Sequence, residues 1–119
     1  MKPGDTVLIR FPQADLRTGK LRPALVIAIT PGRYADVLLA LISSRTDQAI
    51  PAFDEIIELS DPDYGASGLK VRCVIRLARL ATVQSSVINA RLGNISTERL
   101  HKLRGRLVDW LQEQHMEKT

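Results

Sequence analysis

Arg22 is the residue whose type and position are best suited to binding an anion. It precedes Pro23 and the apolar run 24–29, which is too short to cross a membrane and branched enough to favour a buried strand. Because Pro23 favours extended backbone in the preceding residue and donates no hydrogen bond, it fits the first position of a strand and places Arg22 at the rim of a sheet. A guanidinium on such a rigid element is well placed to hold a phosphate, and the alternative is an ion pair with a carboxylate such as Asp15.

The elements that position Arg22 belong to one small domain. A chain of 119 residues argues for a single core, and 45% hydrophobic residues with only 4% aromatics make that core aliphatic. The net charge of +4 and the isoelectric point near 9.6 indicate an anionic partner, either nucleic acid or an acidic protein segment. The single cysteine, Cys73, fits a reducing cytoplasm. Neither a signal peptide nor an apolar run of roughly 20 residues is present, so no membrane association is expected.

The hydrophobic pattern predicts five short strands. They cover residues 6–11, 23–30, 36–42, 53–59 and 71–77, and the last continues over 78–83 after a bulge at Arg79. The segment 53–59 mixes apolar with acidic residues, which is typical of an edge strand. The segments 12–20 and 61–68 lack periodicity and are expected to be loops.

Two helices are expected after the strands. Residues 84–92 predict a short helix stopped by Gly93, and Ser96 caps a long final helix. The stripe of this helix that faces the sheet contains Leu100, Leu103, Leu107 and Leu111, and its other side contains Arg99, Lys102, Arg106 and Glu113. Strands first and helices last predict a small, curled, mostly antiparallel sheet with a terminal helix.

Five short motifs follow one another over nearly the whole chain. They are Gly4-Asp5 with Phe11-Pro12, then Lys20-x-Arg22-Pro23-Ala24-Leu25-Val26, then Leu41-Ile42-Ser43-Ser44, then Val74-Ile75-Arg76-Leu77 with Leu80-Ala81-Thr82-Val83, and finally Leu92-Gly93-Asn94-Ile95-Ser96. In this order they resemble the MazF/PemK family of toxins, also called Kid or ChpK, from bacterial toxin-antitoxin pairs. The resemblance implies that residues 1–119 form one domain, a mainly β SH3-like small barrel of five to seven mostly antiparallel strands with a C-terminal helix.

The resemblance also implies an activity and partners. Members of the family are cytoplasmic, metal-independent endoribonucleases without a cofactor, usually homodimers, which cut single-stranded RNA or mRNA at short sequences and leave a 2',3'-cyclic phosphate. A cognate antitoxin lays an acidic tail over the RNA groove. The family's arginine falls on Arg22 and its hydroxyl at the end of the third strand falls on Ser43, which makes these the candidate catalytic residues. The candidate RNA-binding residues are Arg17, Lys20, Ser44, Arg45, Arg76 and Arg79.

The expected chemistry assigns different tasks to these side chains. Arg22 can donate two parallel hydrogen bonds to the phosphate, and Ser43 can bind a second phosphate oxygen or orient the attacking hydroxyl. A guanidinium with a pKa above about 12 is a poor base, so proton transfer requires other groups. The alternatives are a strand cap for Ser43 and a salt bridge on the barrel surface for Arg76.

Two positions depart from the family pattern. In some members an arginine and an aspartate two residues later contribute to cleavage, whereas here Arg76 is followed by Ala78. The same members carry a histidine in the first loop, and residues 12–21 contain none. Two other functions therefore stay open beside the nuclease. One is an SH3-like module that binds an acidic antitoxin segment or nucleic acid without cleaving it, and the other is a basic module that holds DNA.

Overall fold

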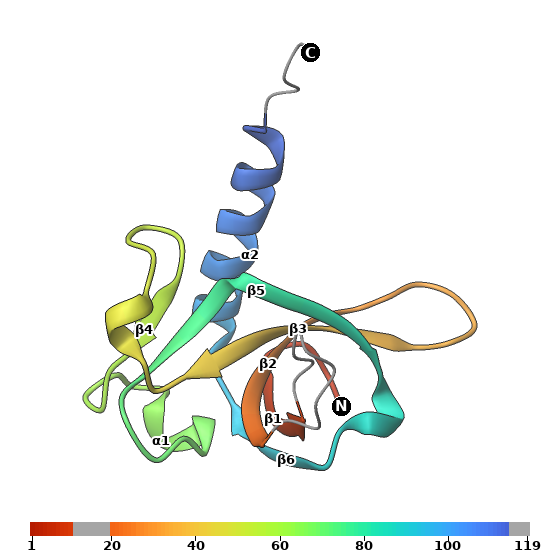
Figure 1. Cartoon of the computed structure of the whole chain (residues 1–119), viewed down its shortest axis with the longest axis horizontal. Helices are drawn as coiled ribbons and strands as arrows, with labels where there is room; N and C mark the ends of the chain where they lie inside the picture. The colour runs from red at the N-terminus through yellow and green to blue at the C-terminus, as the bar shows by residue number, and fades with distance from the viewer. Residues whose placement is uncertain (11–19, 115–119) are drawn as a thin grey trace.

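The computed structural model describes residues 1–10 and 20–114, which form a curled sheet with a long helix at its C-terminal end (Figure 1). The strands are β1 (Asp5–Arg10), β2 (Leu21–Ile29), β3 (Asp36–Ser43), β4 (Glu55–Ile57), β5 (Cys73–Gln84) and β6 (Ala90–Asn94), and the helices are α1 (Tyr64–Ser67) and α2 (Thr97–Gln112), with short 3-10 turns at Thr46–Gln48 and Ser85–Val87. None of the described helices is long and apolar enough to span a bilayer.

All neighbouring strands of the sheet are antiparallel. Their order is β4-β5-β3-β2-β1-β6, and the sheet curls into a half-barrel (Figure 1). The structure therefore confirms a mainly β, barrel-like fold with a C-terminal helix. It also confirms that the segment around β4 lies at an edge of the sheet, although the strand is shorter than the predicted range 53–59.

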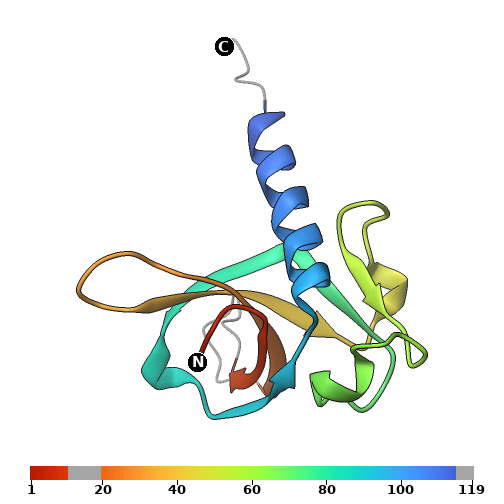
Figure 2. The ribbon, with the colours of Figure 1, turned by 180° about the vertical axis from the view of Figure 1, so that it is seen from behind.

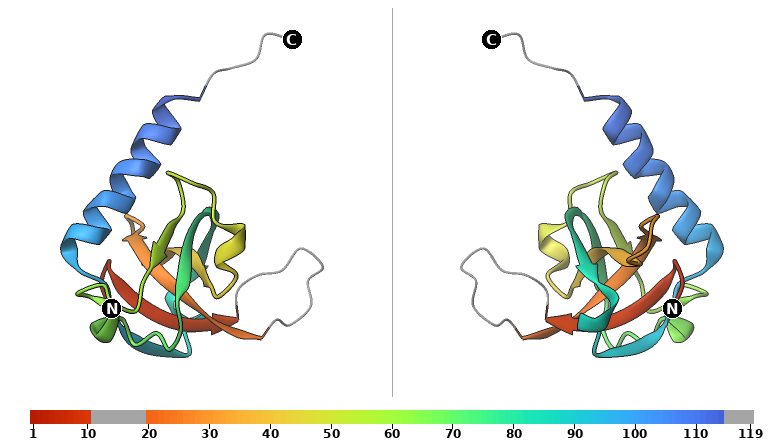
Figure 3. Two further views of the ribbon diagram at one scale, coloured as in Figure 1. Left: turned by 90° about the vertical axis from the view of Figure 1, so that its left-hand side faces the viewer. Right: turned by 90° about the vertical axis from the view of Figure 1, so that its right-hand side faces the viewer.

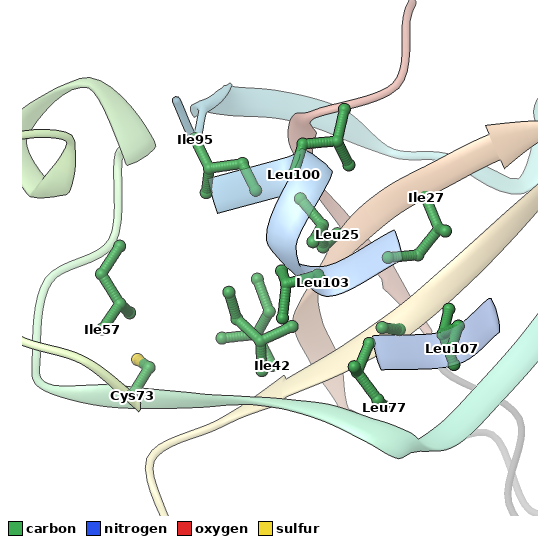
Figure 4. Close-up of a cluster of buried hydrophobic side chains, with 12 residues drawn as sticks. Leu25, Ile27, Ile42, Ile57, Cys73, Leu77, Ile95, Leu100, Leu103 and Leu107 are labelled. Atoms are coloured by element: carbon green, nitrogen blue, oxygen red, sulfur yellow. The ribbon is translucent and has the colours of Figure 1, made fainter. Parts of the chain in front are cut away.

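The sheet is packed on both faces. One cluster of buried aliphatic side chains lies between the sheet and α2, which contributes Leu100, Leu103 and Leu107 (Figure 4). The other cluster contains Val7, Ile9, Ala24, Val26, Val37 and Leu39. Successive residues of β2 alternate between the two clusters, as the period of two in a strand requires. Complete burial of each large aliphatic side chain stabilises the fold by roughly 1.5–3 kcal/mol, so the two clusters hold β2 firmly from both sides.

The predicted bulge near Arg79 is present in β5. Leu41 of β3 pairs with Arg76, whereas the preceding Ala40 pairs with Leu80, so residues 77–79 have no partner in β3. This irregularity bends β5 and lets a single strand contribute to both ends of the half-barrel.

The predicted helix over 84–92 is wrong. After the 3-10 turn Ser85–Val87 the chain forms β6, and Gly93 lies inside this strand opposite Thr6 of β1 instead of ending a helix. The reason is tertiary: β1 would otherwise present an open edge, and pairing along that edge outweighs the local preference of the segment.

The segment 61–68 is not entirely a loop, because it contains the short helix α1. A Cβ atom added to Gly93 would lie 2.0 Å from the carbonyl oxygen of Ala66 and 2.8 Å from the carbonyl carbon of Ser67. Glycine at this position therefore allows the backbone of α1 to pack directly on β6.

We expect Gly93→Ala to lower the free energy of unfolding by about 1–3 kcal/mol, the usual cost of overpacking. The Cβ would force two backbones apart, and neither can move without disturbing the β1–β6 pairing. Urea denaturation followed by circular dichroism measures the change. Gly105→Ala is the control, because nothing lies within 4 Å of its added Cβ and alanine favours the helix by up to about 1 kcal/mol. Equal unfolding midpoints for Gly93→Ala and wild type would contradict this account of the packing.

Helix α2 confirms one part of its prediction and corrects another. The Ser96 hydroxyl oxygen accepts a hydrogen bond from the Arg99 backbone N–H at 3.1 Å, as expected of an N-cap. Leu111, however, is exposed, since the last turns of α2 extend past the strands (Figure 3). Arg99 and Arg106 do not lie on a solvated side either, because both side chains are largely buried in ion pairs with Glu55 of β4.

Candidate nucleic-acid interface

Arg22 lies where its neighbour Pro23 places it, at the beginning of a central strand. β2 starts at Leu21, two residues before the proline, and Arg22 pairs with Ile9 of β1. The ladder to β3 begins only at Ala24, which is consistent with the missing N–H of Pro23. The Arg22 side chain is exposed and has no hydrogen bond or ion pair to any described residue, and Asp15 lies outside the described residues. No described residue therefore occupies the N–H donors of the guanidinium, and they are available to an anion.

Ser43 lies at the end of β3 and is 9% exposed. Its hydroxyl oxygen accepts a hydrogen bond from the Arg45 backbone N–H at 3.0 Å, so the serine does cap the strand. A hydroxyl that accepts one hydrogen bond can still donate another. The strand cap and a role towards a phosphate oxygen are thus compatible.

The strand register brings Arg22 and Ser43 to the same face of the sheet. Ala24 of β2 pairs with Leu41 of β3. In this antiparallel register, a step of two residues back along β2 reaches Arg22, and the same step forward along β3 reaches Ser43. Adjacent strands are about 5 Å apart, and residues two positions apart share a face. The sequence predicted the two side chains separately, and the register is what makes them neighbours.

Arg76 shares this face as well, because it pairs with Leu41 from the other side of β3. We refer to Arg22 of β2, Ser43 of β3 and Arg76 of β5 as the three-strand site. The Nε atom of Arg76 donates to Oδ2 of Asp54 at 2.7 Å, and the Arg76 side chain is only 13% exposed. The salt bridge considered as an alternative for Arg76 therefore exists, but it is buried rather than superficial.

The other predicted RNA-binding residues surround the site without joining it. Lys20 is exposed directly before β2, Ser44 is exposed directly after β3, and Arg79 is exposed in the β5 bulge. Arg45 is exposed, but its guanidinium binds the carboxylate of Asp47 through two hydrogen bonds of 3.0 and 3.1 Å, which lower the pKa of Asp47. Arg17 lies outside the described residues.

Sequence reasoning missed Asp54, the partner of Arg76. The two residues are 22 positions apart and belong to different segments, so no local pattern connects them. Asp54 was read as one of the acids of an edge strand, whereas its side chain is completely buried. A carboxylate beside the large Phe53, just before the apolar pair Ile56-Ile57, is the only signal that the sequence offered.

An apolar groove of about 860 Å³ lies between the loop before β4, the bulged part of β5 and the last turns of α2. It is lined by Ile50, Ala52, Phe53, Leu77, Ala78, Leu80, Arg106, Asp109, Trp110 and Glu113. The rings of Phe53 and Trp110 are 5.6 Å apart and connect the loop before β4 with the last turns of α2. In the described part of the chain, no group of three or more His, Cys, Asp or Glu side chains is arranged to hold a metal ion.

The curled antiparallel sheet, the terminal helix and the cationic three-strand site together define a small barrel-like β protein. The model of one family, described as PemK-like, MazF-like toxin of type II toxin-antitoxin system, matches residues 2–111, and the chain belongs to this family. The match confirms the resemblance carried by the five motifs. A search for similar individual proteins of curated function gave no match.

Proposed function

We propose that this protein is the toxin of a type II toxin-antitoxin pair and acts as a metal-independent, sequence-selective endoribonuclease on single-stranded RNA. The observation that carries the proposal is the position of Arg22. Its guanidinium is exposed at the beginning of a strand packed on both faces, without a partner among the described residues and on the same face of the sheet as Ser43. Family membership supports the same conclusion.

In the proposed reaction the 2'-oxygen of a ribose attacks the adjacent phosphorus, and the bond from phosphorus to the 5'-oxygen breaks. The products are a 2',3'-cyclic phosphate and a 5'-hydroxyl. Negative charge increases on the phosphate oxygens in the transition state, and Arg22 stabilises it with two parallel donors. Ser43 donates its free hydroxyl hydrogen to a further phosphate oxygen. A guanidinium is a poor base, so other groups accept and return the proton.

Incubation of the pure protein with single-stranded RNA in the presence of a chelator tests the proposal. We expect fragments that end in 2',3'-cyclic phosphate, which acid or a phosphatase distinguishes from ordinary 3'-ends. A matched strand of DNA should remain intact because it has no 2'-hydroxyl. Intact RNA after incubation with folded protein would contradict the nuclease.

One observation favours a second candidate, a module that binds without cleaving. Ala78 stands where some family members have a carboxylate, and its methyl side chain can neither accept nor donate a proton; the Ala78 backbone N–H donates to Asp54 at 3.2 Å. Tight binding of RNA or of an acidic peptide without any cleavage would establish this alternative. An acidic antitoxin segment is a suitable ligand for the exposed cations in either case, and the cytoplasm is the expected location.

The proposal includes a homodimer, with a second copy of this chain covering the end of α2. The last turns of this helix extend away from the strands (Figure 3) and expose Val108, Trp110 and Leu111 by 50%, 40% and 61%. Next to them lies the apolar groove with its further exposed residues Ile50 and Leu80. Exposed apolar side chains gathered in this way are typical of a protein interface, and the family's usual dimer supports a second copy of this chain as the partner.

Trp110→Glu is expected to convert the dimer to a monomer, because it places a charge in the apolar surface that the second copy covers. Light scattering coupled to size exclusion measures the mass. His101→Glu introduces the same charge at an exposed position two and a half helical turns earlier, on the side of α2 opposite Trp110, and should leave the dimer intact. A monomeric wild-type protein would refute the dimer, as would a His101→Glu variant that dissociates equally.

A further inference from the structure

The buried carboxylate of Asp54 is held by three donors, two from β5 and one from the loop before β4. Its Oδ2 atom accepts from Arg76 Nε at 2.7 Å and from the Ile50 N–H at 3.0 Å, and its Oδ1 atom accepts from the Ala78 N–H at 3.2 Å. The Asp54 side chain is completely buried. A buried charge persists only where it is paired and hydrogen-bonded, so this pocket is built around the carboxylate.

The contact uses only one edge of the Arg76 guanidinium. Asp54 binds the Nε atom, and neither terminal nitrogen has a partner among the described residues. An arginine held through Nε keeps both terminal amino groups for a second anion. Because Arg76 shares its face of the sheet with Arg22 and Ser43, such an anion would lie within the three-strand site.

The spacing within the site indicates which anion this is. Arg76 lies two strands away from Arg22 and two residues along, so their Cα atoms are about 10–12 Å apart in ordinary sheet geometry. Asp54 holds the Nε atom of Arg76 and keeps this side chain largely buried, so Arg76 does not extend across the sheet to the phosphate that Arg22 binds. A neighbouring phosphate of the same strand is the group that Arg76 can reach.

We propose that Asp54 is a positioning residue for RNA binding, which fixes Arg76 so that its terminal amino groups bind a second phosphate of the substrate strand. The inference rests on the proposed function, since it assumes that RNA binds at the three-strand site. Asp54 itself does not touch the RNA and acts only through Arg76.

The sign of the effect on RNA affinity distinguishes positioning from simple electrostatics. Asp54→Asn removes a negative charge, so a purely electrostatic role predicts tighter binding of an anion. A positioning role predicts weaker binding, because Arg76 loses the charged partner that holds it. One lost charge-assisted contact corresponds to roughly 10-fold in affinity. The loss of this contact also lowers the slope of log affinity against log salt concentration by about the amount that one phosphate contact contributes.

The test measures binding of a fluorescent single-stranded RNA with 2'-deoxy substitutions, which prevent cleavage, at several salt concentrations. We expect about 10-fold weaker binding and a smaller salt slope for Asp54→Asn. The double variant Asp54→Asn/Arg76→Ala should bind RNA no more weakly than Arg76→Ala alone. Asp47→Asn is the matched control, because Asp47 is an exposed aspartate that also pairs with an arginine. It should bind RNA as tightly as wild type or more tightly.

Arg76→Lys keeps the inference testable if Asp54→Asn does not fold. Lysine keeps the net charge and can pair with Asp54, but it has no second donor edge, so RNA affinity should still fall by about 10-fold. Unchanged or tighter binding by folded Asp54→Asn or Arg76→Lys would overturn the inference, even if the wild-type protein cleaves RNA. A wild-type protein that neither cleaves RNA nor binds it would overturn the proposed function and this inference together.

Discussion

Arg22→Ala is expected to reduce RNA cleavage by about 10²–10³-fold, the usual loss when one donor to a developing negative charge is removed. The reason is that Arg22 supplies both parallel donors to the reacting phosphate in the proposed reaction. The fold should remain, because the side chain is exposed and forms no hydrogen bond or ion pair with the described residues. Initial rates on a single-stranded RNA in chelator, together with a thermal melt, measure both effects.

Two controls separate the geometry of Arg22 from its charge. Arg22→Lys keeps the charge but loses the bidentate donor pair, so its rate should lie between those of wild type and Arg22→Ala. Arg33→Ala removes the same charge from the hairpin between β2 and β3, which projects away from the rest of the sheet (Figure 2). It should cleave RNA at nearly the wild-type rate. If Arg22→Lys is fully active, or if Arg33→Ala loses as much activity as Arg22→Ala, general electrostatic attraction rather than phosphate geometry explains the contribution.

The strand that carries Arg22 was predictable because its signals are local. The basic residue before Pro23 and the apolar run after it specify the beginning of a buried strand without reference to any other part of the chain. The position of Arg22 relative to Ser43 was not predictable in the same way. It depends on the register between β2 and β3, which is set by packing on both faces of the sheet.

The errors of the sequence prediction share a physical cause. The local pattern of β6 predicts a helix, whereas its pairing with β1 joins residues more than 80 positions apart. Arg99 was assigned to the solvated side of α2 because a helical period describes only the helix itself. The loop before α1 packs beside that helix, and its residues Asp61 and Asp63 form ion pairs with the arginine and bury it. In each case a contact distant in sequence determined what the local pattern left open.

Arg99→Met is expected to lower the free energy of unfolding by about 3–5 kcal/mol, the cost of removing one partner from a buried ion pair. Arg99 is 13% exposed and donates to Glu55 at 2.9 Å, to Asp61 at 2.8 Å and to Asp63 at 2.9 and 3.0 Å. It thereby joins α2 to β4 and to the loop before α1. Without the arginine, Asp61 and Asp63 keep only hydrogen bonds from the backbone N–H groups of Glu58 and Ser96, with no opposing charge between them. Chemical denaturation at pH 7 measures the loss, and Lys102→Met is the control, since its exposed contact with Glu55 should contribute at most about 1 kcal/mol.

Acid should narrow the stability difference between wild type and Arg99→Met. In the wild type, hydrogen bonds from the Glu58 N–H and from Arg99 lower the pKa of Asp61. Burial alone would raise the pKa of Asp63, but hydrogen bonds from Arg99 and from the Ser96 N–H outweigh it and lower this pKa too. Lowered carboxyl pKa values stabilise the fold above the unfolded value of about 4, and this contribution is lost as the pH falls towards the folded values. In Arg99→Met the crowded carboxylates gain from protonation instead, so the difference should be largest near pH 7 and shrink below about pH 4. A difference that stays constant from pH 7 to pH 3 would show that Arg99 stabilises the fold by packing rather than by its charge.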